Sequence, residues 1–534
     1  MKKTFCMCMV VVVGAACGGA NDAENGTGGA TSAGSGGVGG EVAQNGAACD
    51  AAAQCASGYC ADGVCCESAC DGTCESCATS GSEGVCTRAD AGTNPDNDCV
   101  SGSCDATGSC VGAIHDWSKG FANLNLFDLA TAEDGSVVAV GSFRDTVNLG
   151  GTSLVSAGQR DIIVARLDRD GRHLWSKRFG TATDDQAHAV SIDPAGNIWV
   201  TGFTVPPIDF GGGSRTSGSK NDVFVLKLNP NGAHLFSQVY GFFESDIGDE
   251  IVATADGVYL SGRHLYYIDL GGDALVGPGF YLAKLDLSGQ HVWSKSFGLE
   301  QADAVVPHWS QLAISAQGRI VMTAGFTGTI DLGGGKLTSQ TESDIVIARF
   351  DADGNHEWSK AFPIDNTYAS IATDSEGGVY LASSFFDTVD FGSGALTSAG
   401  GADAFIAAFE ASGEPRWSKR FGNTGTDYLS GMGVSDSGVV SVTGAIEGEV
   451  DFGGGLLNED GETDVVLVRV DGDGTHLFSA SYGGTGDNHS YTLALDGSDV
   501  VIGGACDASI DFGGGPISCS MPFSGTIARF MAAP

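Results

Sequence analysis

From residue 115 onward, apolar and polar positions follow one pattern that recurs along the chain. In residues 175–236, apolar side chains alternate with polar ones through Ala187–Asp193 and Ile198–Gly202, and a third run covers Asp222–Leu228. Turns containing Gly-Asn or Asn-Gly separate these runs. Alternation with a period of two predicts strands, and such turns predict hairpins. The unit therefore predicts four short antiparallel strands, and no segment shows helical periodicity.

Each unit begins with an aromatic residue followed by serine. This anchor recurs at intervals of 57 to 65 residues, which indicates one supersecondary unit copied seven times. The anchors are Trp117, Trp175, Phe236, Trp293, Trp358, Trp417 and Phe478.

Seven four-stranded units predict a radial fold, because each sheet then buries both faces against its neighbours and no long edge stays open. The predicted class is all-β, a seven-bladed β-propeller with four-stranded antiparallel blades over residues 111–534, plus a small disulfide-rich N-terminal module. The strand at His115–Phe121 precedes the first full unit, and the last unit ends at Gly525–Phe530 without an anchor strand. We expect the first strand to complete the last blade. A β-solenoid is the structural alternative, but it gives no reason for this overlap.

The repeated phrases Trp-Ser-Lys, Gly-x-x-x-Val-Thr-Gly, [Ile/Val]-Asp-Phe-Gly-Gly-Gly and Asp-x-x-[Val/Ile]-x-[Lys/Arg]-[Leu/Phe]-Asp resemble those of bacterial β-propeller repeat lipoproteins of the seven-bladed type. The resemblance covers residues 115–534. It implies placement at the cell surface or outside the cell, and no shared catalytic activity. The ligand stays open, because a fold does not determine a function.

The N-terminal residues have the pattern of an export signal. Lys2 and Lys3 precede an apolar run at Phe5–Val13 that is too short to span a bilayer. The run ends in small residues and Cys17, which resembles the lipobox of bacterial lipoproteins and implies lipidation of Cys17. We therefore expect a signal peptide at 1–17 and a lipid-anchored protein of the outer membrane or cell surface, with simple cleavage and secretion as the alternative. Residues 18–48 are dominated by Gly and small polar residues and predict a disordered tether.

Cysteines are concentrated in residues 49–110, where few apolar side chains are available to form a core. In an exported chain this pattern predicts disulfides in place of a core, with a pairing that the sequence does not give. A zinc site at Cys74 and Cys77 is the alternative, although no second ligand pair follows. The stretch Ser57–Cys66 resembles Dickkopf N-terminal-type modules, which implies contact with extracellular protein. The twelve cysteines are Cys49, Cys55, Cys60, Cys65, Cys66, Cys70, Cys74, Cys77, Cys86, Cys99, Cys104 and Cys110.

Two further cysteines, Cys506 and Cys519, flank the Asp-Phe-Gly-Gly-Gly phrase of the last unit and have no counterparts in the other units. We expect them to form a disulfide.

The formal net charge is −40. A surface this acidic repels phosphate backbones and anionic headgroups, so we expect no nucleic-acid partner and membrane contact only through the lipid. The expected partner is an extracellular glycan or protein.

Acidic residues recur just before the innermost predicted strand of successive units. Placed around a ring, they form a candidate rim at the channel mouth, suited to a cation or to glycan hydroxyls. The alternative is that each carboxylate caps its own turn. We expect no cofactor, with Ca²⁺ at this rim as the exception. The residues are Asp185, Asp249, Asp303, Asp365, Asp427 and Asp487.

No catalytic motif stands out, and the histidines that recur two residues before the anchors predict packing, since an active site would occur once. The long connections, such as 204–221 and 325–342, are expected on one face of the disc, which is the predicted binding face. The sequence thus favours a non-catalytic binding or adhesion protein. The alternatives are a polysaccharide-active hydrolase or lyase, which needs a carboxylate pair unique to one blade, and a structural part of an envelope assembly.

Overall fold

A computed structural model describes residues 43–49, 51–61, 63–70, 74–78, 82–89, 103–104, 110–218, 220–299, 309–366, 368–457, 461–520 and 524–532. The predicted signal peptide with Cys17, tether residues 18–42, Cys99 and Asp303 lie outside these ranges. Within the described residues, no helix has the length and apolar character needed to cross a membrane.

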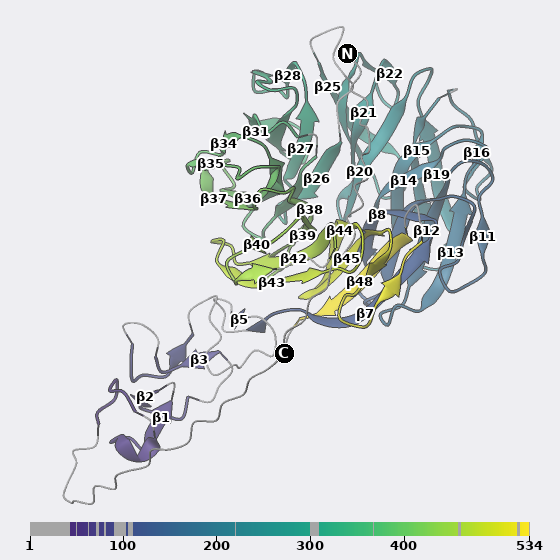
Figure 1. Cartoon of the computed structure of the whole chain (residues 1–534). Coiled ribbons are helices and arrows are strands. Elements are labelled where there is room, and N and C mark those ends of the chain that lie inside the picture. Colours follow the sequence, from purple (N-terminus) through teal and green to yellow (C-terminus); the bar gives the residue numbers. More distant parts are fainter. Residues whose placement is uncertain are drawn as a thin grey trace, which may run out of the picture. The chain divides into compact units, whose positions relative to one another are not determined.

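The propeller consists of seven four-stranded antiparallel sheets, as the repeats predict (Figure 1). We number these blades 1 to 7 along the chain. From the inner strand outward they are β8 (Leu124–Thr131), β9 (Val137–Phe143), β12 (Asp161–Leu167) and β13 (His173–Phe179) in blade 1; β14 (Gln186–Ile192), β15 (Ile198–Thr204), β18 (Asp222–Leu228) and β19 (His234–Tyr240) in blade 2; β20 (Asp246–Thr254), β21 (Gly257–His264), β24 (Gly279–Leu285) and β25 (His291–Gly298) in blade 3; β26 (Ser310–Ile314), β27 (Ile320–Phe326), β30 (Asp344–Phe350) and β31 (His356–Phe362) in blade 4; β32 (Ser370–Thr373), β33 (Val379–Phe385), β36 (Asp403–Phe409) and β37 (Pro415–Phe421) in blade 5; β38 (Tyr428–Val434), β39 (Val440–Ile446), β42 (Asp464–Val470) and β43 (His476–Tyr482) in blade 6; and β44 (Asn488–Asp496), β45 (Asp499–Cys506), β48 (Ser524–Met531) and β7 (Ile114–Ala122) in blade 7.

The ring is closed. The inner strands contact one another in sequence from β8 to β44, and β44 contacts β8 again. The first propeller strand, β7, forms the outer strand of blade 7 and pairs with β48, with Trp117 opposite Arg529. The predicted closure is confirmed, and the solenoid alternative is wrong.

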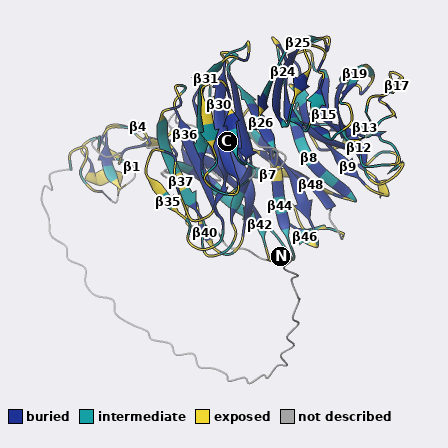
Figure 2. Cartoon of the chain, turned by 90° about the horizontal axis from the view of Figure 1, so that it is seen from above, coloured by how far each residue is buried: buried dark blue, intermediate teal, exposed yellow. Residues whose placement is uncertain are grey.

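The core lies between the blades. Alternate side chains of β9 point to opposite neighbours: Val137 packs in a cluster with Val501 of blade 7, and Val138 packs in a cluster with Val200 of blade 2. Every residue of β9 is therefore buried, and the same holds for the second and third strands of most other blades (Figure 2). Burial on both faces explains why these strands are nearly continuous apolar runs.

The recurring anchors join neighbouring blades. The Trp117 indole N–H of blade 7 donates to the carbonyl of Arg169, in the turn between the third and fourth strands of blade 1, at 2.8 Å. Gly171 of that turn, at φ 72°, lies against the indole, and a Cβ there would come within 2.6 Å of the ring. Trp175, Trp358 and Trp417 make the same bond to the following blade.

A short ribbon connects the second and third strands of each blade. Because the sheets are antiparallel, these ribbons and the connections from one blade to the next lie on one face, which we call the loop face. The ribbons are β10 (Thr146–Val147) with β11 (Leu154–Val155), β16 (Ile208–Asp209) with β17 (Ser214–Arg215), β22 (Tyr267–Ile268) with β23 (Leu275–Val276), β28 (Thr329–Asp331) with β29 (Lys336–Thr338), β34 (Thr388–Asp390) with β35 (Ala395–Thr397), β40 (Val450–Asp451) with β41 (Leu456–Leu457), and β46 (Ser509–Ile510) with β47 (Ile517–Ser518).

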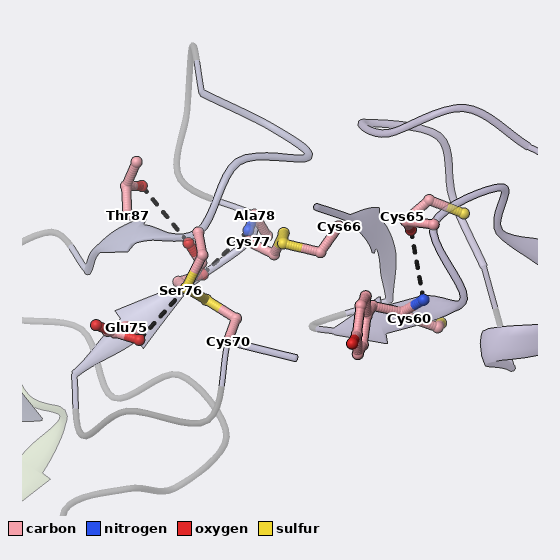
Figure 3. Close-up of a disulfide and its surroundings, with 12 residues drawn as sticks. Cys60, Cys65, Cys66, Cys70, Glu75, Ser76, Cys77, Ala78 and Thr87 are labelled. Carbon is pink, nitrogen blue, oxygen red and sulfur yellow. Dashed lines mark hydrogen bonds between the residues drawn. A yellow bond between two sulfur atoms is a disulfide. The ribbon is translucent and has the colours of Figure 1, made fainter. Parts of the chain in front are cut away.

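The cysteine-rich module has little regular structure and is held by disulfides (Figure 3). Its elements are the 3₁₀ turn η1 (Ala52–Gln54), β1 (Tyr59–Ala61), β2 (Val64–Cys66), β3 (Glu75–Ser76), β4 (Thr87–Arg88), β5 (Ser103–Cys104) and β6 (Cys110–Val111). The bridges are Cys49–Cys60, Cys55–Cys65, Cys66–Cys77, Cys70–Cys86 and Cys74–Cys104. Cys74 and Cys77 therefore belong to two disulfides, and the zinc alternative for this pair is wrong.

Candidate ligand-binding site

A cavity of about 570 Å³ occupies the centre of the ring. All seven blades contribute to its wall through their inner strands or the residue just before them. In order from blade 1 to blade 7, one lining residue of each blade is Phe127, His188, Asp249, Trp309, Ser370, Ser430 and Tyr491.

Five of the seven inner strands are bulged where they line this cavity. In blade 2 the register shifts between Ala187 and Ala189, which leaves His188 as the extra residue. The corresponding extra residues of blades 1, 3, 6 and 7 also line the cavity, and they are Phe127, Asp249, Ser430 and Tyr491. Bulges re-aim side chains. Here they turn one residue per blade toward the channel.

The glycine of the repeated Val-Thr-Gly phrase makes room for the bulge. Gly202 pairs with Ala187, and a Cβ on Gly202 would lie 2.1 Å from the carbonyl oxygen of Gln186. The four other bulged blades have glycine at the same place. Blades 4 and 5, whose described strands have no such shift, have Ala324 and Ser383 instead.

The cavity lies in the half of the channel nearest the loop face. Trp309, Asn366 and Tyr368 precede their inner strands, most other lining residues lie in the first five positions of an inner strand, and Ser383 and Ser384 lie near the end of β33. Inner strands begin at the loop face and second strands end there. The predicted binding face and the cavity are therefore on the same side of the disc.

Three carboxyl groups line the cavity. Asp128, on β8, accepts hydrogen bonds from the Val190 N–H of blade 2 and the Thr492 hydroxyl of blade 7, each at 2.8 Å. Its burial raises the pKa of Asp128 to about 6. Glu250, on β20, accepts the N–H of Ile251 at 3.1 Å, and burial together with the charge of Asp128 raises the pKa of Glu250 well above its ordinary value.

Asp249 is the third carboxyl group, and its residue is only 3% exposed. It accepts the N–H and hydroxyl of Ser310 at 3.2 Å, and its other oxygen lies 3.3 Å from Nε of Arg263. Burial raises the pKa of Asp249 to about 6, although Arg263 opposes this. The two neighbouring carboxyl groups of β20 therefore differ, because Asp249 has a cation partner and Glu250 has a backbone donor.

Aromatic and imidazole rings form a continuous wall beside these carboxyl groups. His188 lies 4.5 Å from the Trp309 ring centre and 5.5 Å from that of Phe127, and Arg263 lies over Trp309 at 5.4 Å. One His188 nitrogen lies 3.0 Å from the carbonyl of Gly248. Burial lowers the pKa of His188 to about 3, so this ring is neutral at physiological pH.

The wall of blades 4 to 6 is rich in hydroxyl and amide groups. Tyr368 donates to the carbonyl of Ser430 at 2.9 Å and accepts from the Gln311 amide at 2.8 Å. The Asn366 amide donates to the Ser384 hydroxyl at 2.9 Å. Tyr368 and Gln311 are thus held by contacts between blades, and Asn366 by a contact within blade 5.

The predicted acidic residues do not occupy equivalent positions. Asp185 and Asp427 directly precede their inner strands and are fully buried, and each accepts two backbone N–H groups of nearby loops, which is the capping role. In blade 3 the position equivalent to Asp185 is occupied by the buried Asp246, because β20 begins there, three residues before Asp249. Of the five described residues of the set, Asp249 alone lines the cavity.

The two remaining described members lie outside the cavity wall. Asp365 has a φ of 47° and precedes the lining residue Asn366. Asp487 accepts the Thr463 hydroxyl at 3.2 Å, and Asn488 takes the first position of β44. Ca²⁺ binding by these carboxylates stays a prediction.

The other sequence expectations concern structure. Cys506 and Cys519 form a disulfide beside the ribbon of blade 7. His234 and its equivalents each place Nε2 about 3 Å from the hydroxyl of the serine three residues on, and pack on the second glycine of a ribbon. The groups of three close metal-ligating side chains among the described residues are Cys49, Cys55 and Cys65 and, separately, Cys70, Glu75 and Cys86, where the cysteines already form disulfides.

Sequence reasoning missed Asp128, Glu250, Phe127 and His188. The signal lies in a comparison of the repeats at two inner-strand positions. The bulge position carries Phe127, His188, Asp249, Ser430 and Tyr491, and the next position carries Asp128, Ala189, Glu250, Gly431 and Thr492. The anchors, the ribbons and the third strands keep one pattern in most units, whereas these inner-strand positions differ among the five bulged blades, and this divergence marks the site.

A second distinctive surface lies on the loop face of blades 2 and 3. Phe242 and Phe243 are 49% and 64% exposed, and Phe242 lies 5.6 Å from Tyr267 beside the 71% exposed Tyr266. We call these four residues the aromatic patch. Because this patch lies outside the cavity wall, a substitution in it can serve as the control for a substitution in the cavity.

No protein-family profile matches the chain. Regulatory protein FlaEY of Caulobacter vibrioides is 23% identical over 371 residues, which is 67% of this chain and 36% of that protein. The chain therefore spans about a third of the length of this curated relative. Among solved structures, the WD40 β-propeller domain of Doa1 is 10% identical at a TM-score of 0.42, covering 79% of this chain and 97% of that one. A puromycin hydrolase mutant in complex with a ligand named PGG is 12% identical at a TM-score of 0.39, covering 76% and 54%.

Proposed function

We propose that the chain is an exported, lipid-anchored surface protein that binds an extracellular glycan in the central cavity of its propeller. The observation that carries this proposal is the contrast between a nearly uniform scaffold and a cavity wall that differs in every blade. Selection for ring formation alone favours similar residues at equivalent positions. Divergence among the residues that line a channel is typical of a binding site on a repeat scaffold.

The chemistry of the wall supports a sugar ligand. A pocket that orients a small ligand combines apolar faces with a few fixed polar groups. Trp309, Phe127 and Tyr491 supply faces against which a sugar ring can stack, and Asn366 and Gln311 supply amides for its hydroxyls. The sequence supports export and anchoring through the apolar run at Phe5–Val13 and Cys17.

Binding to a glycan array tests the ligand class, and paired variants test the site. Trp309→Ala removes a cavity ring, and Tyr266→Ala removes an exposed ring of the aromatic patch. We expect the first to weaken binding at least tenfold and the second to leave it unchanged. Loss of binding in Tyr266→Ala with retention in Trp309→Ala would place the site on the aromatic patch and refute the proposal.

The anchor is tested separately, by the mass of the N-terminal peptide of the mature protein. We expect a peptide that begins at Cys17 and carries acyl chains. An unmodified N-terminal peptide would end the lipid part of the proposal and leave the binding part intact.

Glycoside cleavage is the second candidate function. Asp128 and Glu250 favour it, since they are carboxyl groups of raised pKa in one cavity, without counterparts in the other blades. They come from blades 1 and 3 and not from one blade. Release of new reducing ends from a bound polysaccharide, lost in Glu250→Gln, would establish an enzyme in place of a binding protein.

A further inference from the structure

The cavity wall holds more acidic groups than the protein itself pairs with cations. Asp128, Asp249 and Glu250 all line it, and Arg263 pairs with Asp249. Among the described residues, neither Asp128 nor Glu250 forms an ion pair with a lysine or arginine. His188 stands nearby as a neutral ring. The site therefore holds two carboxyl groups without a cation.

Asp249 supports the same conclusion independently. Asp249 is only 3% exposed. Its Oδ1 lies 3.3 Å from Nε of Arg263 in an ion pair, but the two atoms do not have the geometry of a hydrogen bond. An unsatisfied carboxylate oxygen at a cavity wall is a place for a donor from outside. Three carboxyl groups in the wall thus favour a ligand that brings N–H donors and positive charge.

The aromatic wall adds to this preference. Ring faces attract cations, and the attraction is strongest where water is excluded. His188 and Trp309 are in contact, Phe127 lies beside His188, and Tyr491 belongs to the bulge position of the neighbouring blade 7. A protonated amine between these rings and the carboxylates meets both kinds of attraction.

The opposite wall decides between a bare amine and an amino sugar. Asn366, Gln311 and Ser384 offer amide and hydroxyl groups that hydrogen bonds already hold in place, between blades 4 and 5 for Gln311 and within blade 5 for Asn366 and Ser384. Their oxygens keep lone pairs that these bonds do not use, and sugar hydroxyls can bond to them whereas the chain of an alkylamine cannot.

Resting on the glycan-binding function proposed above, we propose that the cavity binds a hexosamine residue with a free, protonated amino group, held between Asp128 and Glu250 and the aromatic wall. The hydroxyls of the sugar face the amide and hydroxyl groups of blades 4 to 6. Acetylation of the amine removes its charge, so the acetylated sugar is excluded by the same carboxylates.

Isothermal titration of the full chain at pH 7.5 tests this assignment with three probes of equal length. They are tetramers of glucosamine, of N-acetylglucosamine and of glucose. We expect the glucosamine tetramer to bind at least tenfold more tightly than either of the others, and its affinity to fall with rising salt. Spermidine is the fourth probe, and we expect it to bind at least tenfold more weakly than the glucosamine tetramer.

Glu250→Gln is the main variant, because among the described residues the Glu250 side chain accepts one hydrogen bond, from the adjacent backbone N–H of Ile251. We expect it to reduce affinity for the glucosamine tetramer about tenfold and to leave affinity for the glucose tetramer unchanged. Asp273→Asn, at an exposed loop-face carboxylate, is the matched control for the loss of one charge. We expect it to have no effect.

The outcomes separate the two proposals. Equal binding of charged and neutral tetramers, with no effect of Glu250→Gln, overturns the amino-sugar assignment and leaves glycan binding in place. Spermidine binding as tightly as the glucosamine tetramer overturns the sugar part of the assignment. Failure of every oligosaccharide, on the array and in titration, overturns both.

Discussion

The carboxylate of Asp128 accepts a hydrogen bond from the hydroxyl of Thr492 at 2.8 Å, although 364 residues separate them. The bond links the inner strands of the first and last blades, and it also helps to keep charge on a carboxyl group whose burial raises its pKa. Ring closure and the candidate site therefore share this contact.

Thr492→Val tests this contact. The valine keeps the shape of the side chain and removes the donor, so we expect the free energy of unfolding to fall by about 1–3 kcal/mol. Denaturant titration measures it. Thr485→Val, at an exposed threonine of the same blade that bonds Ser509, is the control and should stay within about 0.5 kcal/mol of the parent. Equal effects in the two variants would contradict a special role for the buried bond.

The cavity carboxyl groups predict a pH dependence of stability. The folded-state pKa values of Asp128 and Asp249 are raised to about 6, and that of Glu250 is also raised. The folded chain therefore holds protons that the unfolded chain releases, so the stability due to the two aspartates falls as pH rises from about 4 to about 6, and that due to Glu250 falls as pH rises through its own raised pKa. His188 acts in the opposite direction, since its pKa is lowered to about 3.

Comparison with Glu250→Gln isolates the carboxyl contribution, because His188 and Arg263 are present in both proteins. Glutamine does not ionise, so we expect the fall in melting temperature between pH 4 and pH 7 to be smaller in the variant. Thermal unfolding at intervals across this range measures the difference. Parallel curves for the two proteins would show that Glu250 is not held in a raised-pKa state.

Gly202→Ala tests the link between glycine and bulge. The new Cβ would lie 2.1 Å from the Gln186 carbonyl oxygen, so the inner strand must move, and we expect a loss of about 1–3 kcal/mol. Ala324→Gly, at the equivalent place in a blade without the bulge, should cost only about 0.5–1 kcal/mol through backbone entropy. Chemical denaturation compares them, and similar costs would remove the steric explanation.

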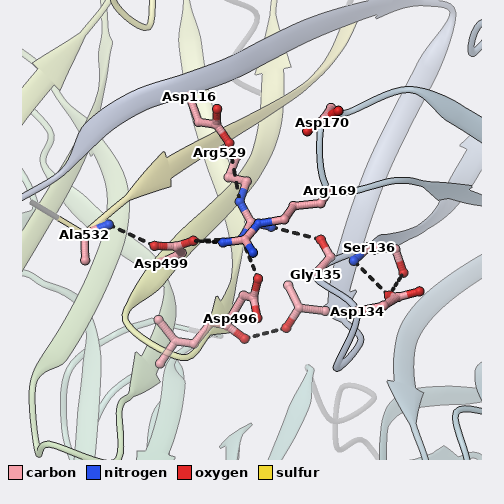
Figure 4. A network of polar contacts seen from close by, with 12 residues as sticks. Asp116, Asp134, Gly135, Ser136, Arg169, Asp170, Asp496, Asp499, Arg529 and Ala532 are labelled. Atoms are coloured by element: carbon pink, nitrogen blue, oxygen red, sulfur yellow. Dashed lines mark hydrogen bonds and ion pairs between the residues drawn. The ribbon is translucent and has the colours of Figure 1, made fainter.

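Arg529 provides a test of the last blade (Figure 4). It is fully buried, donates to the Gly135 carbonyl of blade 1 at 2.9 Å, and pairs with Asp499 and Asp496 of its own blade. Arg529→Met leaves Asp496 without its cation and Asp499 with only the exposed Arg169, and we expect a loss of about 3–5 kcal/mol. Arg172→Met, at a side chain 73% exposed, is the control and should change stability by less than about 1 kcal/mol.

The disulfide Cys506–Cys519 closes a short segment around the ribbon of blade 7. Replacement of both residues by serine should reduce the free energy of unfolding by about 2–3 kcal/mol. Alkylation of the parent protein without reductant, followed by mass spectrometry, should label neither thiol. Labelling of both would contradict the bridge.

The features that the sequence predicts correctly are those that every blade needs. Trp117 and Gly171 recur because each blade must hold the turn of the next, so their periodicity reveals the fold and even the closing strand. The candidate ligand-binding residues, in contrast, do not recur from blade to blade. Asp128 and Glu250 occupy one strand position in two blades that are not neighbours along the ring, and only the closed ring brings both into one cavity.

The predicted acidic rim shows the limit of pattern reading. Asp185 and Asp249 look equivalent in sequence because both precede an apolar run. The bulge and the earlier start of β20 separate them by three positions, so one caps a loop and the other lines the cavity. Register depends on pairing with the next strand, and the spacing of aspartates along the chain does not contain it.

The closing strand has a mechanical consequence. The chain enters β7 at Ile114, which is paired with Met531 on the face of the short turns, opposite the loop face. Under the anchoring proposed above, a tether held at the N-terminus would pull on the propeller through β7. The hydrogen bonds between β7 and β48 would then carry that load, so the strand that completes the ring would also join the propeller to its anchor.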